Sequence, residues 1–172
     1  MPISEDLLKN NINDFFIETG SANGVTISKA LTAGFKKIFS VEIFKRRYKR
    51  CKKKFLKNNK VNLFFGESPQ FIRKVINEID GNITFWLDAH PNSVENINPL
   101  LDELSEISKH HIKTHTILID DMRLMGHGVW PSKEKIIECI KKINNDYIIS
   151  YEDNYDAKHD IHRQNEVMVC KV

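Results

Sequence analysis

Residues 15–26 are Phe15-Phe16-Ile17-Glu18-Thr19-Gly20-Ser21-Ala22-Asn23-Gly24-Val25-Thr26. The apolar run that ends in an acid predicts a strand, and the glycines after it predict a tight turn. The helical pattern that follows predicts a helix. The next apolar run ends at Glu42. Glycines allow close approach to a ligand, a helix N-terminus offers free N–H groups, and the later carboxylate can accept both ribose hydroxyls. The pattern predicts a site for a nucleoside-carrying cofactor.

The spacing of the glycines distinguishes between cofactors. A dinucleotide site has the pattern Gly-x-Gly-x-x-Gly, whereas this turn has Glu18, Gly20 and Gly24 in the pattern Glu-x-Gly-x-x-x-Gly. Glu18 inside the turn would repel a pyrophosphate, but it suits a ligand with a cationic sulfonium and an amino group. The predicted cofactor is therefore S-adenosylmethionine, and Ser21 belongs to its predicted binding turn.

Composition narrows the class of protein. Of the 172 residues, 41% are hydrophobic and 28% are charged, which is ordinary for a globular protein, and we expect a single domain over residues 1–172. No apolar run is long enough to span a bilayer, and Met1–Asp6 is not typical of a signal peptide. Three widely spaced cysteines predict free thiols in the reducing cytoplasm.

Strand and helix patterns alternate along the chain and end in two strands with no helix between them. This order predicts an α/β fold with a mostly parallel sheet, helices on both faces and a C-terminal antiparallel hairpin. The seven expected strands are residues 14–18, 37–42, 61–65, 83–87, 116–119, 147–151 and 166–171. The expected helices are residues 25–33, residues 45–57, a helix with Ser68 as N-cap and Pro69 at its first position that ends at Gly81, and helices opened by Asn98-Pro99 and Pro131-Ser132.

Basic side chains are concentrated in the expected helix 45–57, which begins Lys45-Arg46-Arg47-Tyr48-Lys49-Arg50. Such a run can contact nucleic-acid phosphates. It also fits a solvated helix face, with the buried stripe supplied by Phe44, Tyr48, Cys51 and Phe55. We favour the solvated face and keep nucleic-acid binding as the alternative.

Ligands of open parallel sheets bind where the strands end, and nearly every such end in this chain carries an acid. Glu18 and Glu42 fit cofactor binding, whereas Glu67 fits capping of the following helix. Ser68 could cap the same helix while its hydroxyl or N–H faces an adenine edge. These ends therefore form the predicted cofactor site.

Asp88, Asp120 and Asp121 follow two of the expected strands. Neighbouring strands lie about 4.8 Å apart, so the three carboxylates can converge on one ion. Oxygen ligands favour Mg²⁺ or another hard divalent cation. The alternative is an acidic edge neutralised by Arg123, Lys113 or Lys133. His90, two residues after Asp88, could remove a proton from a bound hydroxyl or act as a ligand itself.

With these motifs the chain resembles the class I S-adenosylmethionine-dependent methyltransferases over essentially its full length. The segments Phe85-Trp86-Leu87-Asp88-Ala89-His90 and Leu118–Gly126 look like the metal-binding segments of catechol O-methyltransferase and its relatives. The resemblance implies a Rossmann-like class I methyltransferase fold. It places Thr26 near the methionine carboxylate, Glu42 at the ribose, Ser68 at the adenine, and Mg²⁺ at Asp88, Asp120 and Asp121.

Two departures from that family stand out. Its catalytic lysine, three residues after the metal-binding aspartate of the fourth strand, corresponds to Pro91 here, so Asp88 and His90 remain the catalytic candidates. The long N-terminal helices that cover the substrate in those enzymes have no counterpart, and a neighbour in a homo-oligomer could supply the cover.

The sequence thus predicts a metal-assisted O-methyltransferase that acts on a small hydroxyl-bearing acceptor. Two alternatives stay open: a nucleic-acid methyltransferase that uses the basic helix 45–57, and a non-catalytic S-adenosylmethionine-binding module. The base-holding motif expected of the former does not follow the fourth strand, where the sequence is Asp88-Ala89-His90-Pro91-Asn92.

Overall fold

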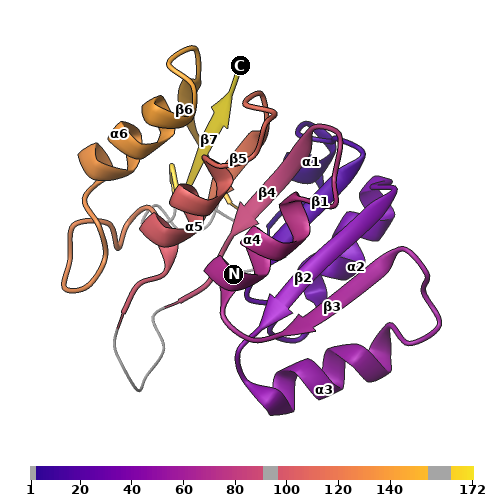
Figure 1. Ribbon diagram of the computed structural model, residues 1–172. Coiled ribbons are helices and arrows are strands. Elements are labelled where there is room, and N and C mark those ends of the chain that lie inside the picture. Colours follow the sequence, from indigo (N-terminus) through magenta and orange to yellow (C-terminus); the bar gives the residue numbers. More distant parts are fainter. Residues whose placement is uncertain (1–2, 91–96, 155–163) are drawn as a thin grey trace.

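The computed structural model describes residues 3–90, 97–154 and 164–172. Its strands form one twisted sheet in the order β3-β2-β1-β4-β5-β7-β6 (Figure 1). The first five strands are parallel, and β7 runs antiparallel to both β5 and β6. The strands are β1 (Phe15–Thr19), β2 (Lys37–Glu42), β3 (Val61–Phe65), β4 (Ile83–Leu87), β5 (Thr116–Ile119), β6 (Ile148–Glu152) and β7 (Val167–Lys171).

Helices cover both faces of this sheet (Figure 1). One core cluster packs α4, α5 and α6 on one face, and a second packs α1 and α2 on the other, while α3 lies beside β3. No helix of the described residues is long and apolar enough to cross a membrane. The helices are α1 (Glu5–Lys9), α2 (Val25–Ala33), α3 (Lys45–Lys54), α4 (Ser68–Ile76), α5 (Leu100–Ile107) and α6 (Lys133–Ile143).

The predicted alternation and the terminal hairpin are confirmed, and the bounds of β2, β3, β4, β5 and α2 agree with the prediction. Four local predictions, at helices α4 and α3, are wrong. The N-cap of α4 is Glu67 rather than Ser68, and this helix ends at Ile76. Helix α3 ends at Lys54, before residue 57, and Phe44 is 45% exposed instead of belonging to a buried stripe. The prediction also missed the short helix α1, where Ser4 Oγ accepts a hydrogen bond from Leu7 N at 3.1 Å.

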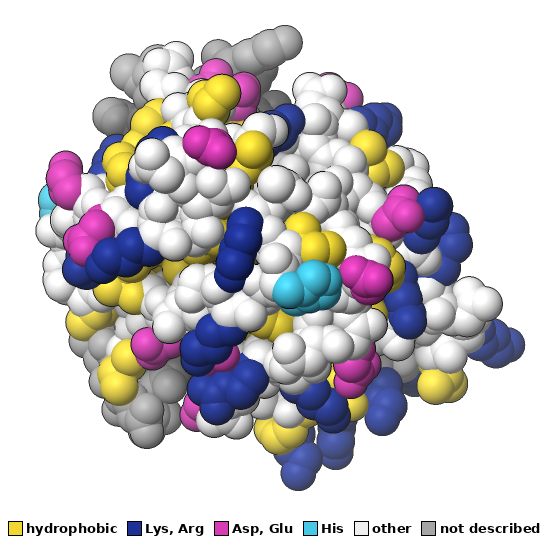
Figure 2. All heavy atoms as spheres, turned by 45° about the horizontal axis from the view of Figure 1, so that its top comes forward, with side chains coloured by type: hydrophobic (Ala, Val, Ile, Leu, Met, Phe, Trp, Pro, Cys, Tyr) yellow, Lys and Arg dark blue, Asp and Glu magenta, His cyan; other side chains and the backbone are white. Residues whose placement is uncertain are grey.

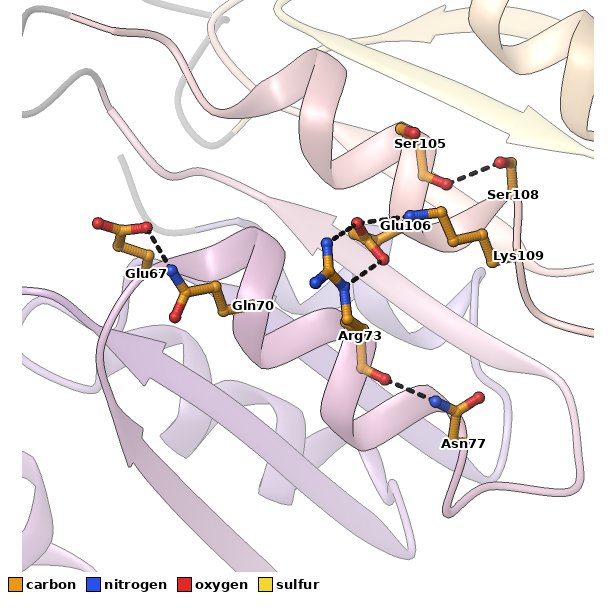
Figure 3. Close-up of polar contacts among 8 residues, drawn as sticks. All are labelled: Glu67, Gln70, Arg73, Asn77, Ser105, Glu106, Ser108 and Lys109. Carbon is orange, nitrogen blue, oxygen red and sulfur yellow. Dashed lines mark hydrogen bonds and ion pairs between the residues drawn. The ribbon is translucent and has the colours of Figure 1, made fainter.

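An ion pair joins α4 to α5 (Figure 3). Arg73 donates from Nη2 to Glu106 Oε1 at 2.7 Å and from Nε to Oε2 at 3.1 Å. Lys109 Nζ donates to the same Glu106 at 2.7 Å. The Arg73 hydrogen bonds lower the pKa of Glu106 to about 2, so this carboxylate is charged at neutral pH. The pair fixes the position of α5, whose first turn lies next to the cavity described below.

Two buried histidines tie the segment before β5 to the start of β4. His115 Nδ1 accepts the N–H of Ile83 at 3.2 Å, which leaves the proton of its ring on Nε2. That proton points at His110 Nδ1, 2.8 Å away, and His110 Nε2 in turn lies 3.0 Å from Ile79 O. These contacts fix the orientation of both rings. Burial lowers the pKa of His115 to about 3.

We expect replacement of His115 by asparagine to flatten the pH dependence of stability. The folded pKa of about 3 lies below the unfolded value of about 6.5. The contribution of His115 is therefore present above pH 6.5 and declines as pH falls towards 3. Between pH 7.5 and 5 the wild type should lose about 2 kcal/mol more of its free energy of unfolding than the variant, as measured by urea denaturation.

The slope of the wild type must be compared with that of His115→Asn, because two buried carboxyls change the free energy of unfolding with pH in the opposite direction to His115. Glu18 and Glu103 both have a pKa raised to about 7, so their contributions fall as pH rises towards 7. They are present in both proteins and cancel in the difference. His127→Asn, at an exposed residue in the loop after β5, is the matched control and should keep the wild-type slope. An unchanged slope in His115→Asn would contradict the assignment.

Candidate functional site

A cavity of about 690 Å³ opens where β1, β2, β3 and β4 end. This volume is within the range of small-molecule and cofactor sites. The carboxyl ends of parallel strands converge there, as expected from the sheet topology. Seven of the predicted site residues line the cavity: Gly20, Ser21, Thr26, Glu42, Ser68, Asp88 and His90. Four predicted residues are not in its described lining: Glu18, Gly24, Asp120 and Asp121.

Gly20 holds the turn against the neighbouring strand ends. Its φ is +87°, and a Cβ added there would lie 2.8 Å from the backbone oxygen of Asp88. The N–H groups of Gly20 and Ser21 both donate to Val41 O, at 3.0 and 2.9 Å. Glycine is therefore required because the backbone of the turn approaches the backbone of Asp88 closely. This contact brings the turn, the end of β2 and the end of β4 together at the cavity.

Glu42 ends β2 with its carboxylate at the cavity. Oε2 accepts the N–H of Ala22 at 2.9 Å, and Oε1 accepts the N–H of Phe44 at 2.9 Å. Its side chain is buried, with 3% of the residue exposed, so these two bonds fix its orientation. Each carboxylate oxygen can accept more than one hydrogen bond. Glu42 thus keeps acceptor capacity at the cavity, and its contact with two ribose hydroxyls stays a prediction.

Glu18 lies behind the turn. Its Oε2 accepts a hydrogen bond from Ser40 Oγ at 2.5 Å, and Ser40 Oγ lies 2.6 Å from Ser21 Oγ. Burial raises the pKa of Glu18 to about 7, against the opposing effect of hydrogen bonds from Ser40 and Thr26. In this position Glu18 braces β1, β2 and the turn, and its direct contact with a ligand stays a prediction.

The N-terminus of α2 points into the cavity through Val25 and Thr26. Its N-cap is Gly24, with φ of +67° and no side-chain hydrogen bond to the first turn. The first amides of this nine-residue helix are therefore without a side-chain cap, which suits an anionic group such as a carboxylate. Gly24 also packs tightly, because a Cβ there would lie 2.6 Å from a ring carbon of Phe55.

Glu103 on α5 is a buried acid that the sequence analysis missed. Burial raises its pKa to about 7 against the opposing effect of the Ser68 and Thr19 hydroxyls, and its Oε1 is buried without a hydrogen-bond partner among the described residues. Thr19 Oγ1 also accepts the N–H of Asp88 at 3.2 Å. The sequence did indicate a buried acid, because Glu103 lies on the same helix face as the apolar residues Leu100, Leu104 and Ile107. Glu103 thus connects the Ser68 side of the cavity to the Asp88 side.

The predicted metal ligands are divided into two groups. Ligand atoms of Asp88, His90 and Asp121 lie within 4.8 Å of one another, and so do those of Asp120, Asp121 and Glu166. The first group borders the cavity through Asp88 and His90. Asp121, with φ of +60°, takes part in both. The structure thus brings His90 to the acids, and no group that unites all three aspartates is found among the described residues.

Cations of the chain itself partly neutralise these acids. His90 Nε2 lies 2.7 Å from Asp121 Oδ2, and Arg123 Nη1 lies 2.9 Å from Asp121 Oδ1. Arg123 also pairs with Glu166. The alternative of an acidic edge paired with Arg123 therefore describes the second group. In the first group, Asp88 Oδ1 is buried without a hydrogen-bond partner among the described residues, and His90 Nδ1 lies 3.8 Å from it. Burial, together with Asp120, raises the pKa of Asp88 well above its usual range.

Comparison with solved structures identifies the architecture. An O-methyltransferase from Bacillus cereus in complex with SAH matches with a TM-score of 0.67 at 11% identity, over 98% of this chain and 78% of that chain. The O-methyltransferase TomG from Streptomyces achromogenes, in complex with SAM, matches with a TM-score of 0.68 at 9% identity, over 98% and 77%. This chain has the class I methyltransferase fold. No protein-family model and no curated protein matches the sequence.

Within the class I methyltransferase fold, the cavity lies at the ends of β1, β2, β3 and β4. An SAH-bound methyltransferase from Podospora anserina also matches, with a TM-score of 0.63 at 11% identity, over 97% of this chain and 75% of that chain. Pro91, at the position that the resemblance assigns to a catalytic lysine, lies outside the described residues.

Proposed function

We propose that this protein is an S-adenosylmethionine-dependent O-methyltransferase that acts on a small hydroxyl-bearing acceptor with the assistance of a divalent cation. The observation that carries the proposal is one cavity with two kinds of group at its ends. One kind is the turn containing Gly20 together with Glu42, and the other is Asp88 with His90. Two of the similar structures are named as O-methyltransferases, which supports the same class of reaction.

The cofactor half of the proposal follows from the chemistry of the lining. Glu42 accepts the ribose hydroxyls, and Ser68 provides a polar group for the adenine edge. The uncapped N-terminus of α2 binds the methionine carboxylate through its first N–H groups and its positive dipole end. Glu18 supports the turn from behind. In this arrangement the chain binds the cofactor through one acid, one hydroxyl and backbone amides, with no requirement for a phosphate-binding loop.

The residues fit a divalent cation at Asp88, His90 and Asp121. Asp88 offers a buried oxygen without a hydrogen-bond partner in the described part of the chain, and the ligand atoms of the three residues lie within 4.8 Å of one another. Because an imidazole joins two carboxylates, Mn²⁺ fits this set as well as Mg²⁺. A cation bound there would supply Lewis acidity that lowers the pKa of an acceptor hydroxyl.

The chain's own part in catalysis is positioning and proton transfer. The His90 side chain is 56% exposed at the cavity, and its Nε2 is oriented by Asp121 at 2.7 Å. Trp130 packs edge-on against this ring with centroids 5.8 Å apart. An oriented imidazole beside an acceptor hydroxyl can take its proton, while the cavity holds the acceptor oxygen in line with the methyl group. His90 is thus either a ligand or the base.

Direct binding tests the two halves of the proposal. We expect S-adenosylhomocysteine to bind in isothermal titration, and Mn²⁺ to bind as followed by the loss of its free electron paramagnetic resonance signal. Asp88→Asn should weaken Mn²⁺ binding at least about tenfold, because the variant loses a charged ligand. Asp102→Asn, at another acid that lines the cavity, is the matched control and should leave Mn²⁺ binding unchanged.

The outcomes separate the candidate functions. Absence of S-adenosylhomocysteine binding would overturn the whole proposal. Equal Mn²⁺ binding by the wild type and Asp88→Asn would overturn the cation site alone. Cofactor binding without methyl transfer to catechols, sugars or other hydroxyl acceptors would favour the non-catalytic binding module.

A further inference from the structure

Helix α3 has an unusual charge distribution. Eight of its ten residues are Lys or Arg and none is acidic, and all eight are exposed. The whole chain has a net charge of +3, so the residues outside α3 carry a net charge of −5. On the face drawn in Figure 2, dark-blue Lys and Arg side chains gather along the lower edge, the side on which α3 lies in Figure 1. The net positive charge of this protein therefore resides on one helix, which carries eight of the 26 Lys and Arg residues.

The charges of α3 are not compensated within the described part of the chain. None of its eight cations has a carboxylate within ion-pair distance there, whereas α6 pairs Lys135 and Lys142 with Glu138 at 3.0 and 2.6 Å. Like charges four residues apart destabilise a helix. In α3 they occur at Lys45/Lys49, Arg46/Arg50, Lys49/Lys53 and Arg50/Lys54. A helix face exposed only to solvent usually carries charges of both signs. The uniformly positive face of α3 is therefore better explained by an anionic partner than by contact with water alone.

Aromatic side chains lie among these cations. Phe44 and Phe65 are 45% and 54% exposed, and the rings of Tyr48 and Phe65 are in contact with centroids 5.5 Å apart. Arg47 lies over Phe44 at 5.0 Å, and Lys52 lies over Tyr48 at 5.6 Å. Exposed rings beside cations are the two components of single-strand recognition, because bases stack on the rings while phosphates meet the cations.

The same helix borders the cofactor cavity. Phe44 and Arg47 are part of the cavity lining. Arg50 Nη1 donates to Asn23 Oδ1 at 2.9 Å, and Lys54 Nζ donates to Gly24 O at 3.0 Å. The basic surface and the turn beside the cavity are thus physically joined. A strand that lies along α3 would reach the mouth of the cavity.

We infer that α3, together with Phe44, Tyr48 and Phe65, binds a single strand of nucleic acid. The inference goes beyond the proposed function and does not depend on it, because it rests on the charge and the aromatic rings of α3. The cations lie over the rings instead of on a face opposite to an apolar one, and this arrangement favours a stacked strand over an anionic membrane surface.

The electrostatic part of the inference is tested with a fluorescein-labelled, mixed-sequence RNA of about 20 nucleotides in fluorescence anisotropy. The triple variant Lys49→Gln, Lys52→Gln and Lys53→Gln should bind about 100-fold more weakly at 0.1 M salt, and the slope of log K against log salt should fall by about 2. The control triple Lys9→Gln, Lys74→Gln and Lys135→Gln removes the same charge elsewhere and should bind like the wild type. S-adenosylhomocysteine affinity should be unchanged in both.

The aromatic part is tested with Phe65→Ala. This variant should lose about tenfold in affinity for the single strand without a change in salt slope, because stacking is not electrostatic. Ile148→Ala, at a 73% exposed residue of β6, is the control and should bind normally. The inference is overturned if the wild type does not bind the strand, or if a duplex or phosphatidylserine vesicles bind as tightly and Phe65→Ala has no effect.

Discussion

Replacement of Gly20 by alanine is expected to lower the free energy of unfolding by about 3 kcal/mol. The new Cβ would lie 2.8 Å from the Asp88 backbone oxygen, at a φ of +87°. A residue with a side chain costs about 1–2 kcal/mol in the left-handed region, and displacing a backbone carbonyl adds to this cost. Thermal denaturation should show a melting temperature lower by about 6–12 °C.

Gly34→Ala is the matched control for this prediction. Gly34 also has a positive φ, +106°, but a Cβ there would meet only Ile12 Cδ1 at 3.7 Å. This variant should therefore show only the conformational cost, and the difference between the two variants measures the close approach of the turn to β4. Equal melting temperatures would show that the contact with Asp88 is relieved at no cost. Because Gly20 also lines the cavity, its variant should bind S-adenosylhomocysteine more weakly, whereas Gly34→Ala should not.

Glu42→Ala is expected to weaken S-adenosylhomocysteine binding about 100-fold or more. Hydrogen bonds to a charged group contribute about 1.5–3 kcal/mol each, and this carboxylate is positioned to accept two ribose hydroxyls. The variant also frees the N–H groups of Ala22 and Phe44, which the carboxylate now fixes at 2.9 Å. Isothermal titration gives the affinity, and urea denaturation without ligand gives the structural part of the effect.

Two further variants separate recognition from structure at this position. Glu42→Gln keeps an acceptor oxygen and should retain part of the affinity. Glu67→Ala removes a different carboxylate that lines the same cavity, and it should leave the affinity unchanged. If Glu42→Ala and Glu67→Ala had equal effects, the assignment of Glu42 to the ribose would be wrong.

The sequence predicted the parallel sheet well because its central strands are buried on both faces. The strands β2, β4 and β5 are runs of apolar residues bounded by turns, and their bounds needed no knowledge of tertiary contacts. Helix α1 was missed because five residues are too short for a periodic pattern. The N-cap of α4 was misplaced because Glu67 and Ser68 are both acceptable first residues, and only the backbone conformation decides between them.

The candidate site was predictable only where its residues belong to local sequence motifs. The turn and the strand-end acids are local motifs, so the convergence of Gly20, Glu42 and Asp88 at one cavity followed from topology. By contrast, Glu18, Asp120 and Asp121 are not in its described lining. The pairing of Arg123 with Glu166, and the contact of His90 with Asp121, join residues from different loops, and no spacing in the sequence encodes them. The left-handed backbone of Asp121, with φ of +60°, turns its carboxylate between these two cations, and a strand pattern does not reveal such a turn.

The two ion pairs of Asp121 have a consequence for how the protein is made. His90 and Arg123 each occupy one of its carboxylate oxygens, so the charge of this residue is balanced by the polypeptide itself. Newly synthesised chains can therefore complete their fold before any ion arrives. At the proposed cation site, loading would then be an exchange of partners in an already folded protein, and we expect metal depletion during expression to leave the yield of folded protein unchanged.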